Sequence, residues 1–172
     1  MLGALSQFHV LIVDDSAHIR RLVIAMLRCY GCTQISEART AQQALEILNK
    51  SPVVDIALID WMLAESQHNG TDLVKHIRRS PHDHLIYLPI IMMTGHTDRE
   101  NIETARDAGI TEFLAKPFTA KGLHTRLVNL IEQPRPFVRT STFFGPDRRR
   151  RNTEPPENGE RRLHLARREK SK

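Results

Sequence analysis

Residues 8–16 read Phe8-His9-Val10-Leu11-Ile12-Val13-Asp14-Asp15-Ser16, a mostly apolar run that ends in two carboxylates. A short apolar run of this kind is typical of a strand buried on both faces of a parallel sheet. Four further strand candidates follow along the chain, at residues 34–37, 56–59, 90–93 and 112–115, and three of the five candidates are continuously apolar. The segments between them carry apolar residues at helical spacing. This alternation predicts an α/β fold with five parallel strands and five helices.

The helix boundaries carry local signals of their own. Thr40 and Thr119 precede the second and fifth predicted helices, where a hydroxyl can cap the first backbone N–H groups. Gly31 and Gly109 follow the first and fourth predicted helices, where a residue with positive φ commonly ends a helix. We expect the folded domain to span residues 1–132.

The last forty residues differ sharply from that domain. Residues 133–172 contain 12 Lys and Arg against 5 Asp and Glu, a net charge of +7, which leaves −2 of the chain's +5 for residues 1–132. Five of the nine prolines and the run Arg148-Arg149-Arg150-Arg151 also lie in this tail. Such a composition buries little apolar surface, so we predict a basic Pro/Arg-rich tail that is mostly disordered.

Cysteine usage and hydropathy bear on the cellular compartment. The two cysteines stand close together at Cys29 and Cys32, too few for a disulfide framework. The apolar run at residues 85–97 is short and contains Pro89, and we see no export signal. We therefore expect a cytoplasmic protein without a membrane span, and the Cys-x-x-Cys spacing is best explained by packing and a turn.

Polar side chains end four of the five predicted strands. Asp14 and Asp15 follow the first strand, Asp60 the third, Thr94 the fourth and Lys116 the fifth. Because the carboxyl ends of parallel strands meet at one edge of the sheet, we expect these groups to converge there.

Three converging carboxylates require positive charge. At about 5 Å and an effective dielectric constant of about 20, each pair repels by roughly 3 kcal/mol. Lys116 supplies one charge, and an all-oxygen ligand set without His or Cys favours Mg²⁺ over Zn²⁺. An Asp beside Mg²⁺, Lys and Thr is placed to attack phosphorus and to hold the phosphoryl oxygens.

Residues 8–132 resemble a bacterial two-component response-regulator receiver domain of the stand-alone, chemotaxis-regulator type. Four motifs carry the resemblance. They are Val10-Leu11-Ile12-Val13-Asp14-Asp15-Ser16, Leu58-Ile59-Asp60-Trp61, Ile91-Met92-Met93-Thr94-Gly95 and Phe113-Leu114-Ala115-Lys116-Pro117-Phe118. The resemblance implies a flavodoxin-like (βα)5 fold with helices on both faces of the sheet.

The resemblance also implies roles for individual residues. Asp60 is expected to accept a phosphoryl group from a histidine kinase or phosphotransfer protein. Asp14, Asp15, Asp60 and the Met62 carbonyl are expected to hold Mg²⁺. Three further expectations concern the rest of the site: Lys116 contacts the phosphoryl group, Thr94 bonds one of its oxygens, and Phe113 is an aromatic switch. The Lys116-Pro117 bond is expected to be cis.

This sequence departs from the family pattern after the phosphoacceptor. The segment from Met62 to Gly70 lacks the proline that usually follows, and it is about two residues longer than usual, so the third helix is expected to start differently. Met62 and His96 occupy the positions two beyond Asp60 and Thr94 that influence phosphoryl lifetime in the family.

These features predict a phosphorylation-activated signalling switch that acts by protein–protein contact on a downstream target and is not an enzyme. Homodimer formation is left open. A haloacid-dehalogenase-type phosphohydrolase is disfavoured because position 62 is Met and not a second Asp. No glycine-rich phosphate-binding motif is present, so we expect no nucleotide cofactor. Most of the nine histidines are expected at the surface.

The tail leaves an alternative function open. Its arginines alternate with Phe137, Val138, Phe143 and Phe144, a mixture that suits an acidic protein face and, as a weaker alternative, nucleic acid under receiver control. Phosphorylation of Asp60 adds negative charge, which would draw the tail toward that end of the sheet, beside Phe113.

Overall fold

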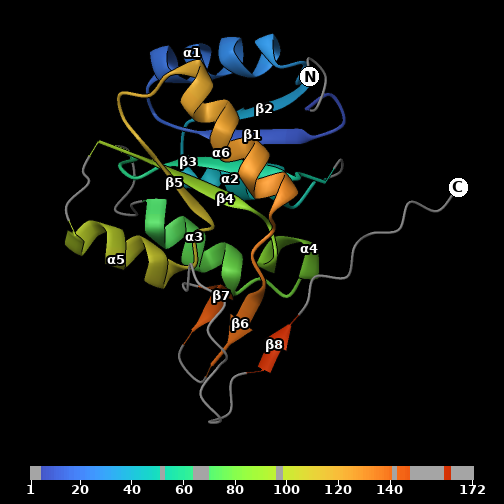
Figure 1. Ribbon diagram of the computed structural model, residues 1–172, viewed down its shortest axis with the longest axis vertical. Coiled ribbons are helices and arrows are strands. Elements are labelled where there is room, and N and C mark those ends of the chain that lie inside the picture. Colours follow the sequence, from blue (N-terminus) through green and yellow to red (C-terminus); the bar gives the residue numbers. More distant parts are fainter. Residues whose placement is uncertain are drawn as a thin grey trace, which may run out of the picture.

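The computed structural model describes residues 5–50, 53–63, 70–95, 99–140, 143–147 and 161–163. Five parallel strands form the central sheet in the order β2-β1-β3-β4-β5 (Figure 1). They are β1 (His9–Val13), β2 (Gln34–Ala38), β3 (Ile56–Asp60), β4 (Ile90–Thr94) and β5 (Glu112–Ala115). All five lie where the apolar runs predict them, and the α/β receiver-type architecture is confirmed.

Helices cover both faces of this sheet (Figure 1). They are α1 (Ala17–Cys29), α2 (Ala41–Leu48), α3 (Gly70–Arg78), α4 (Asp83–Ile86), α5 (Arg99–Ala108) and α6 (Ala120–Glu132). Side chains alternate along each strand, so Val10 and Ile12 pack with α1 and α6 while Leu11 and Val13 pack on the opposite face. The two apolar layers fix the register of the sheet and therefore the position of every strand end.

The predicted helix boundaries are confirmed. Thr40 accepts a backbone hydrogen bond from Gln43, and Thr119 accepts one from Gly122, so each caps its helix. Gly31 has φ of 84° and Gly109 has φ of 96°, the conformation that favours glycine after a helix.

Two features differ from the sequence-based expectation. The short helix α4, which begins at Asp83, lies between α3 and β4 in addition to the five helices that the sequence predicts. His9 is buried, whereas most histidines are expected at the surface. Its ring nitrogens lie 2.8 Å from Ser36 Oγ and 3.3 Å from the Val53 carbonyl oxygen. A buried imidazole is tolerated where its polar atoms are hydrogen-bonded.

The beginning of the tail is part of the packed body. Strands β6 (Phe137–Arg139) and β7 (Phe144–Pro146) pair antiparallel, and β8 (Arg161–Leu163) pairs with the other edge of β6. We call β6 and β7, with Thr140 and Phe143, the tail hairpin. These strands follow the domain boundary expected at residue 132, which stays a prediction. The prediction of disorder for most of the tail otherwise falls on residues 141–142, 148–160 and 164–172, which lie outside the described ones.

The tail hairpin lies beneath α3 and α4 in Figure 1. The Phe137 ring meets the Tyr87 ring edge-on at 5.1 Å, and the Arg78 guanidinium lies 5.2 Å from its centroid. Gly109 and Gly145 face each other closely, since a Cβ on Gly145 would lie 3.0 Å from Gly109 Cα. Tyr87 and Gly109 precede β4 and β5, so the hairpin covers the amino ends of these strands. The docking beside Phe113, which is expected on phosphorylation of Asp60, stays a prediction.

Candidate functional site

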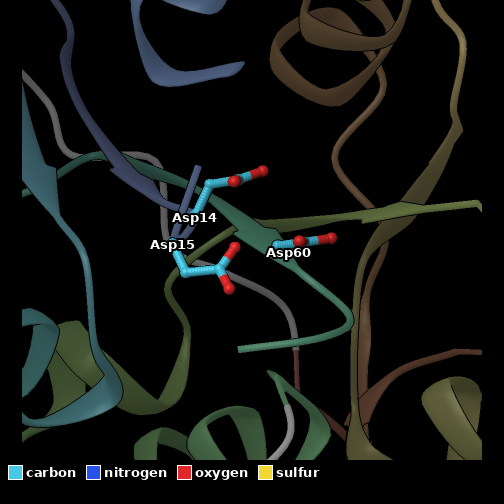
Figure 2. Close-up of side chains that lie close together, drawn as sticks. All are labelled: Asp14, Asp15 and Asp60. Atoms are coloured by element: carbon cyan, nitrogen blue, oxygen red, sulfur yellow. The ribbon is translucent and has the colours of Figure 1, made fainter. Parts of the chain in front are cut away.

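Three aspartates gather at the carboxyl ends of β1 and β3 (Figure 2). One carboxylate oxygen from each of Asp14, Asp15 and Asp60 lies within 4.8 Å of the others. Asp14 and Asp60 are buried, whereas Asp15 is half-buried. The predicted convergence of these side chains is confirmed, because the parallel register places the ends of β1 and β3 side by side.

Lys116 joins two of the three carboxylates. Its Nζ lies 2.9 Å from Asp14 Oδ2 and 3.0 Å from Asp60 Oδ1. The Lys116 backbone N–H donates to the Thr94 carbonyl at 2.7 Å, which continues the pairing of β4 and β5 to the site. The peptide bond from Lys116 to Pro117 is cis, as expected. The ammonium therefore contacts both buried carboxylates and offsets one of their two negative charges.

Burial and charge act in opposite directions on these groups. Burial raises the pKa of Asp60 above its ordinary value; the Lys116 ammonium partly offsets this increase, and the Asp14 charge adds to it. Burial alone would lower the pKa of Lys116, but hydrogen bonds and charge from Asp14 and Asp60 raise it overall. Lys116 thus stays protonated at neutral pH and favours ionised carboxylates beside it.

The cluster has the chemistry of a site for a hard divalent cation. Three carboxylates face a single ammonium, so the cluster carries a net charge of −2 when all three carboxylates are ionised. At 4.8 Å and an effective dielectric constant of about 20, each carboxylate pair repels by about 3.5 kcal/mol. The cluster contains oxygen ligands alone, which suit Mg²⁺. The donor set fits that ion.

The other predicted site residues lie around this cluster. Thr94 is buried at the end of β4, opposite Ala115 in the register, and Phe113 is partly buried within β5. Met62, two residues after Asp60, has a side chain that is 58% exposed. His96 and the loop at residues 64–69 lie outside the described residues, and α3 begins at Gly70. The ligand role of the Met62 carbonyl stays a prediction.

Arg20 is a site residue that the motifs did not reveal. From α1, its Nη1 donates to the carbonyls of Asp14 at 2.8 Å and Asp15 at 3.2 Å, and its Nε pairs with Glu37 at 3.1 Å. The backbone N–H of Ser16 also donates to Asp14 Oδ1 at 2.9 Å. These bonds fix the loop that carries two of the three carboxylates. One signal was available, since Arg20 lies one helical turn after the Ser16 cap.

Gly70 is a second such residue. Its backbone N–H donates to the Trp61 carbonyl at 2.8 Å, and a Cβ at this position would collide with the Asp60 carbonyl oxygen. The start of α3 therefore packs directly against the strand end that carries Asp60. A glycine ten residues after an aspartate gives no sign of this contact in the sequence.

The cysteine pair takes no part in this site. Cys32 is buried, with its Sγ 3.6 Å from the carbonyl oxygens of Phe8 and Gln34, while Cys29 is exposed, and both are free thiols. The packing interpretation of Cys32 is consistent with these contacts.

Comparison with known proteins agrees with the fold. Residues 10–128 match the family described as the response regulator receiver domain. The chain is 37% identical over 124 residues to the chemotaxis protein CheY-3 of Vibrio cholerae, covering 72% of this chain and 92% of that protein. It is 33% identical over 124 residues to the chemotaxis protein CheY of Pseudomonas aeruginosa, covering 72% and 96%.

Solved structures show the same likeness. The receiver domain of NtrX from Brucella abortus is 30% identical, with a TM-score of 0.63, and the match covers 72% of this chain and 98% of that one. The Vibrio cholerae chemotaxis protein CheY4 is 29% identical, with a TM-score of 0.63, covering 70% and 95%. These matches cover about the length of the central domain. Separately, no described helix has the length and apolar character needed to cross a membrane.

Proposed function

This chain belongs to the family of response regulator receiver domains, and we propose from that membership that Asp60 is its phosphoacceptor in a two-component phosphorelay. The observation that carries the proposal is the contact of the Lys116 ammonium with both Asp14 and Asp60, 2.9 and 3.0 Å away, at the edge where Asp15 also lies. The adjacent ammonium favours the ionised form of Asp60, which is the form that acts as a nucleophile.

The proposed step is a transfer of one phosphoryl group. An Asp60 carboxylate oxygen attacks the phosphorus of a phosphohistidine on a kinase or phosphotransfer protein. The new O–P bond forms as the P–N bond breaks, and the electron pair of that bond returns to the imidazole, which then takes a proton from solvent. The donor class follows from the family; the acceptor follows from the burial and position of Asp60.

Asp14, Asp15 and Asp60, with the Met62 carbonyl, are proposed to hold Mg²⁺. Bound Mg²⁺ would supply the positive charge that offsets the crowded carboxylates and the phosphoryl oxygens. Ser16 and Arg20 fix the orientation of the loop that presents Asp14 and Asp15. Without that support, the two acidic side chains would separate to relieve their repulsion.

Lys116 and Thr94 are proposed to bind the phosphoryl oxygens once Asp60 is modified. Modification adds close to two negative charges beside an ammonium that already lies 3.0 Å from Asp60. Phe113 lies in the middle of β5, two residues from Ala115, which pairs with Thr94. A shift of Thr94 toward a phosphoryl oxygen would therefore change the packing around Phe113, the proposed switch.

The output is proposed to be contact with a downstream protein in the cytoplasm, with no catalytic turnover of its own. The family consists of signalling proteins, and the relatives that this chain matches over most of their length include chemotaxis proteins.

The test is phosphorylation of the full chain by acetyl phosphate, followed by intact mass spectrometry. Wild-type protein should gain one phosphoryl group in the presence of Mg²⁺ and none with excess EDTA. Asp60→Asn should gain none, because an amide is not a comparable nucleophile. Asp72→Asn, an exposed carboxylate on α3, is the matched control and should behave as wild type.

One result would overturn the assignment of Asp60. If Asp60→Asn takes up one phosphoryl group in wild-type yield at another aspartate, then Asp60 is not the acceptor. Uptake by wild type that is the same in EDTA as in Mg²⁺ would overturn the proposed metal site.

A further inference from the structure

A cavity of about 490 Å³ lies between the end of α3, the end of α5 and the tail hairpin. It is at the amino ends of β4 and β5, so it is separate from the Asp60 site at their carboxyl ends. Its volume is within the range of small-molecule sites. The hairpin forms one wall, so the cavity depends on the part of the chain that follows the receiver domain.

The cavity is strongly cationic. Lys75, Arg78, Arg79 and Arg139 line it, and Asp107 is the carboxylate among its lining residues, so the lining carries a net charge of +3. Lys75 is exposed on α3, Arg79 is exposed directly after the end of α3, and Arg139 is exposed on β6. Cations from two separate segments thus meet around one hollow, which favours a ligand with several negative charges.

Arg78 is the buried member of this group, with 6% of the residue exposed. Its Nε donates to the Gly109 carbonyl at 2.9 Å and its Nη1 to the Ile86 carbonyl at 3.1 Å. Its Nη2 has no hydrogen-bond partner among the described residues, and no carboxylate there forms an ion pair with it. Burial lowers the pKa of Arg78 to about 9, so the guanidinium is still charged at neutral pH. A buried charge of this kind is stabilised by an anionic partner.

Part of the lining is apolar and aromatic. Phe143 and Phe144 are half-buried and line the cavity together with Ile86. The Arg139 guanidinium lies 4.8 Å from the centroid of the Phe144 ring. Aromatic rings beside guanidinium groups form the kind of surface on which a planar base stacks while its phosphates contact the cations.

We propose that this cavity binds a nucleoside di- or triphosphate. The phosphates contact Arg79, Arg139 and the buried Arg78, and the base lies against the wall of Phe143 and Phe144. The site uses side-chain cations in place of the glycine-rich loop that the sequence lacks. It is formed by α3 and the tail hairpin, so the ligand ties the tail to the domain, whether or not Asp60 is phosphorylated.

The test is isothermal titration calorimetry of the full chain with ATP, pyrophosphate and adenosine, each without Mg²⁺. ATP should bind more tightly than either fragment. Arg79→Ala and Arg139→Ala should each weaken ATP binding about tenfold, the effect of losing one favourable charged contact. Arg21→Ala, an exposed arginine on α1, is the matched control and should leave the affinity unchanged.

A second control separates the cavity from the arginine run of the tail. Arg149→Ala combined with Arg150→Ala should retain ATP affinity within about twofold, since a change that small is below 0.5 kcal/mol. The proposal is overturned if ATP does not bind at concentrations of about 1 mM. It is also overturned if pyrophosphate binds as tightly as ATP. A third result would also overturn the proposal. If the Arg149/Arg150 double variant loses ATP binding while Arg79→Ala and Arg139→Ala keep the wild-type affinity, the ligand binds elsewhere.

Discussion

Phe137→Ala should destabilise the whole domain, although Phe137 lies beyond the last helix of the receiver fold. Phe137 is 2% exposed, and its ring lies 5.1 Å from the Tyr87 ring and 5.6 Å from the Phe144 ring. The Arg78 guanidinium lies 5.2 Å from its centroid. If these contacts hold the tail hairpin to α3 and α4, then removing the ring affects the stability of the body.

The expected magnitude follows from these contacts. Truncation of a buried Phe to Ala costs about 3–5 kcal/mol, and the aromatic and cation–π contacts account for about 1 kcal/mol or more of this. Because the hairpin lies at the periphery and can partly collapse onto the gap, we expect about 3 kcal/mol. Phe137→Leu keeps most of the volume and loses the ring contacts, so it should cost about 1 kcal/mol.

The assay is urea unfolding of the full chain, followed by far-UV circular dichroism. With an m-value of about 2 kcal/mol/M, a loss of 3 kcal/mol lowers the midpoint by about 1.5 M. Phe143→Ala, which removes a half-buried ring of the same hairpin, is the control and should cost less than half as much. A loss below about 0.5 kcal/mol for Phe137→Ala, within the range of surface substitutions, would refute the packing of the hairpin on the body.

Three further outcomes are expected at the carboxylate cluster, all measured by urea unfolding in metal-free buffer. Asp15→Ala should raise the free energy of unfolding by about 1 kcal/mol, because it relieves repulsion that solvent partly screens at this half-buried position; a clear decrease would contradict the crowding. Lys116→Met should lower it by about 2–3 kcal/mol, since it leaves Asp14 and Asp60 buried without their cation, and Mg²⁺ should restore part of the loss. An unchanged stability would show that the ammonium does not stabilise the two buried carboxylates. Burial raises the pKa of Asp60, so the folded chain binds this proton more tightly than the unfolded chain. The contribution of Asp60 to stability therefore falls as the pH rises from the ordinary pKa of 3.8 through the pKa in the folded state. The difference in unfolding free energy between wild type and Asp60→Asn should therefore change over this interval, and a constant difference would contradict the raised pKa.

Local patterns in the sequence predicted most of the central domain. Continuous apolar runs predict buried parallel strands, and helical spacing places helices between them, because both periodicities come from backbone geometry that each segment carries by itself. The caps at Thr40 and Thr119 and the positive φ of Gly31 and Gly109 are equally local. Once five parallel strands are predicted, the meeting of Asp14, Asp15 and Asp60 at one edge follows from topology.

What the sequence could not determine depends on contacts between distant segments. The sequence places Lys116 at the same sheet edge as Asp14 and Asp60, but its direct contacts with both, at 2.9 and 3.0 Å, come from the tertiary structure. Gly70 is required by the approach of one carbonyl oxygen, which only the path of the chain brings close. These contacts of Lys116 and Gly70 depend on how distant segments pack in three dimensions, and no short-range sequence pattern predicts them.

The tail shows the same division most clearly. Its composition predicts a basic, proline-rich segment with little apolar surface, and that description of the composition holds. Phe137 and Val138 are nevertheless buried, because Tyr87 and Arg78 provide a surface that the tail lacks on its own. The sequence by itself determined the receiver fold and the residues at its strand ends, since both follow from periodicity. Only the tertiary structure decided where the tail hairpin packs, because that depends on a surface assembled from α3, α4 and the turn before β5.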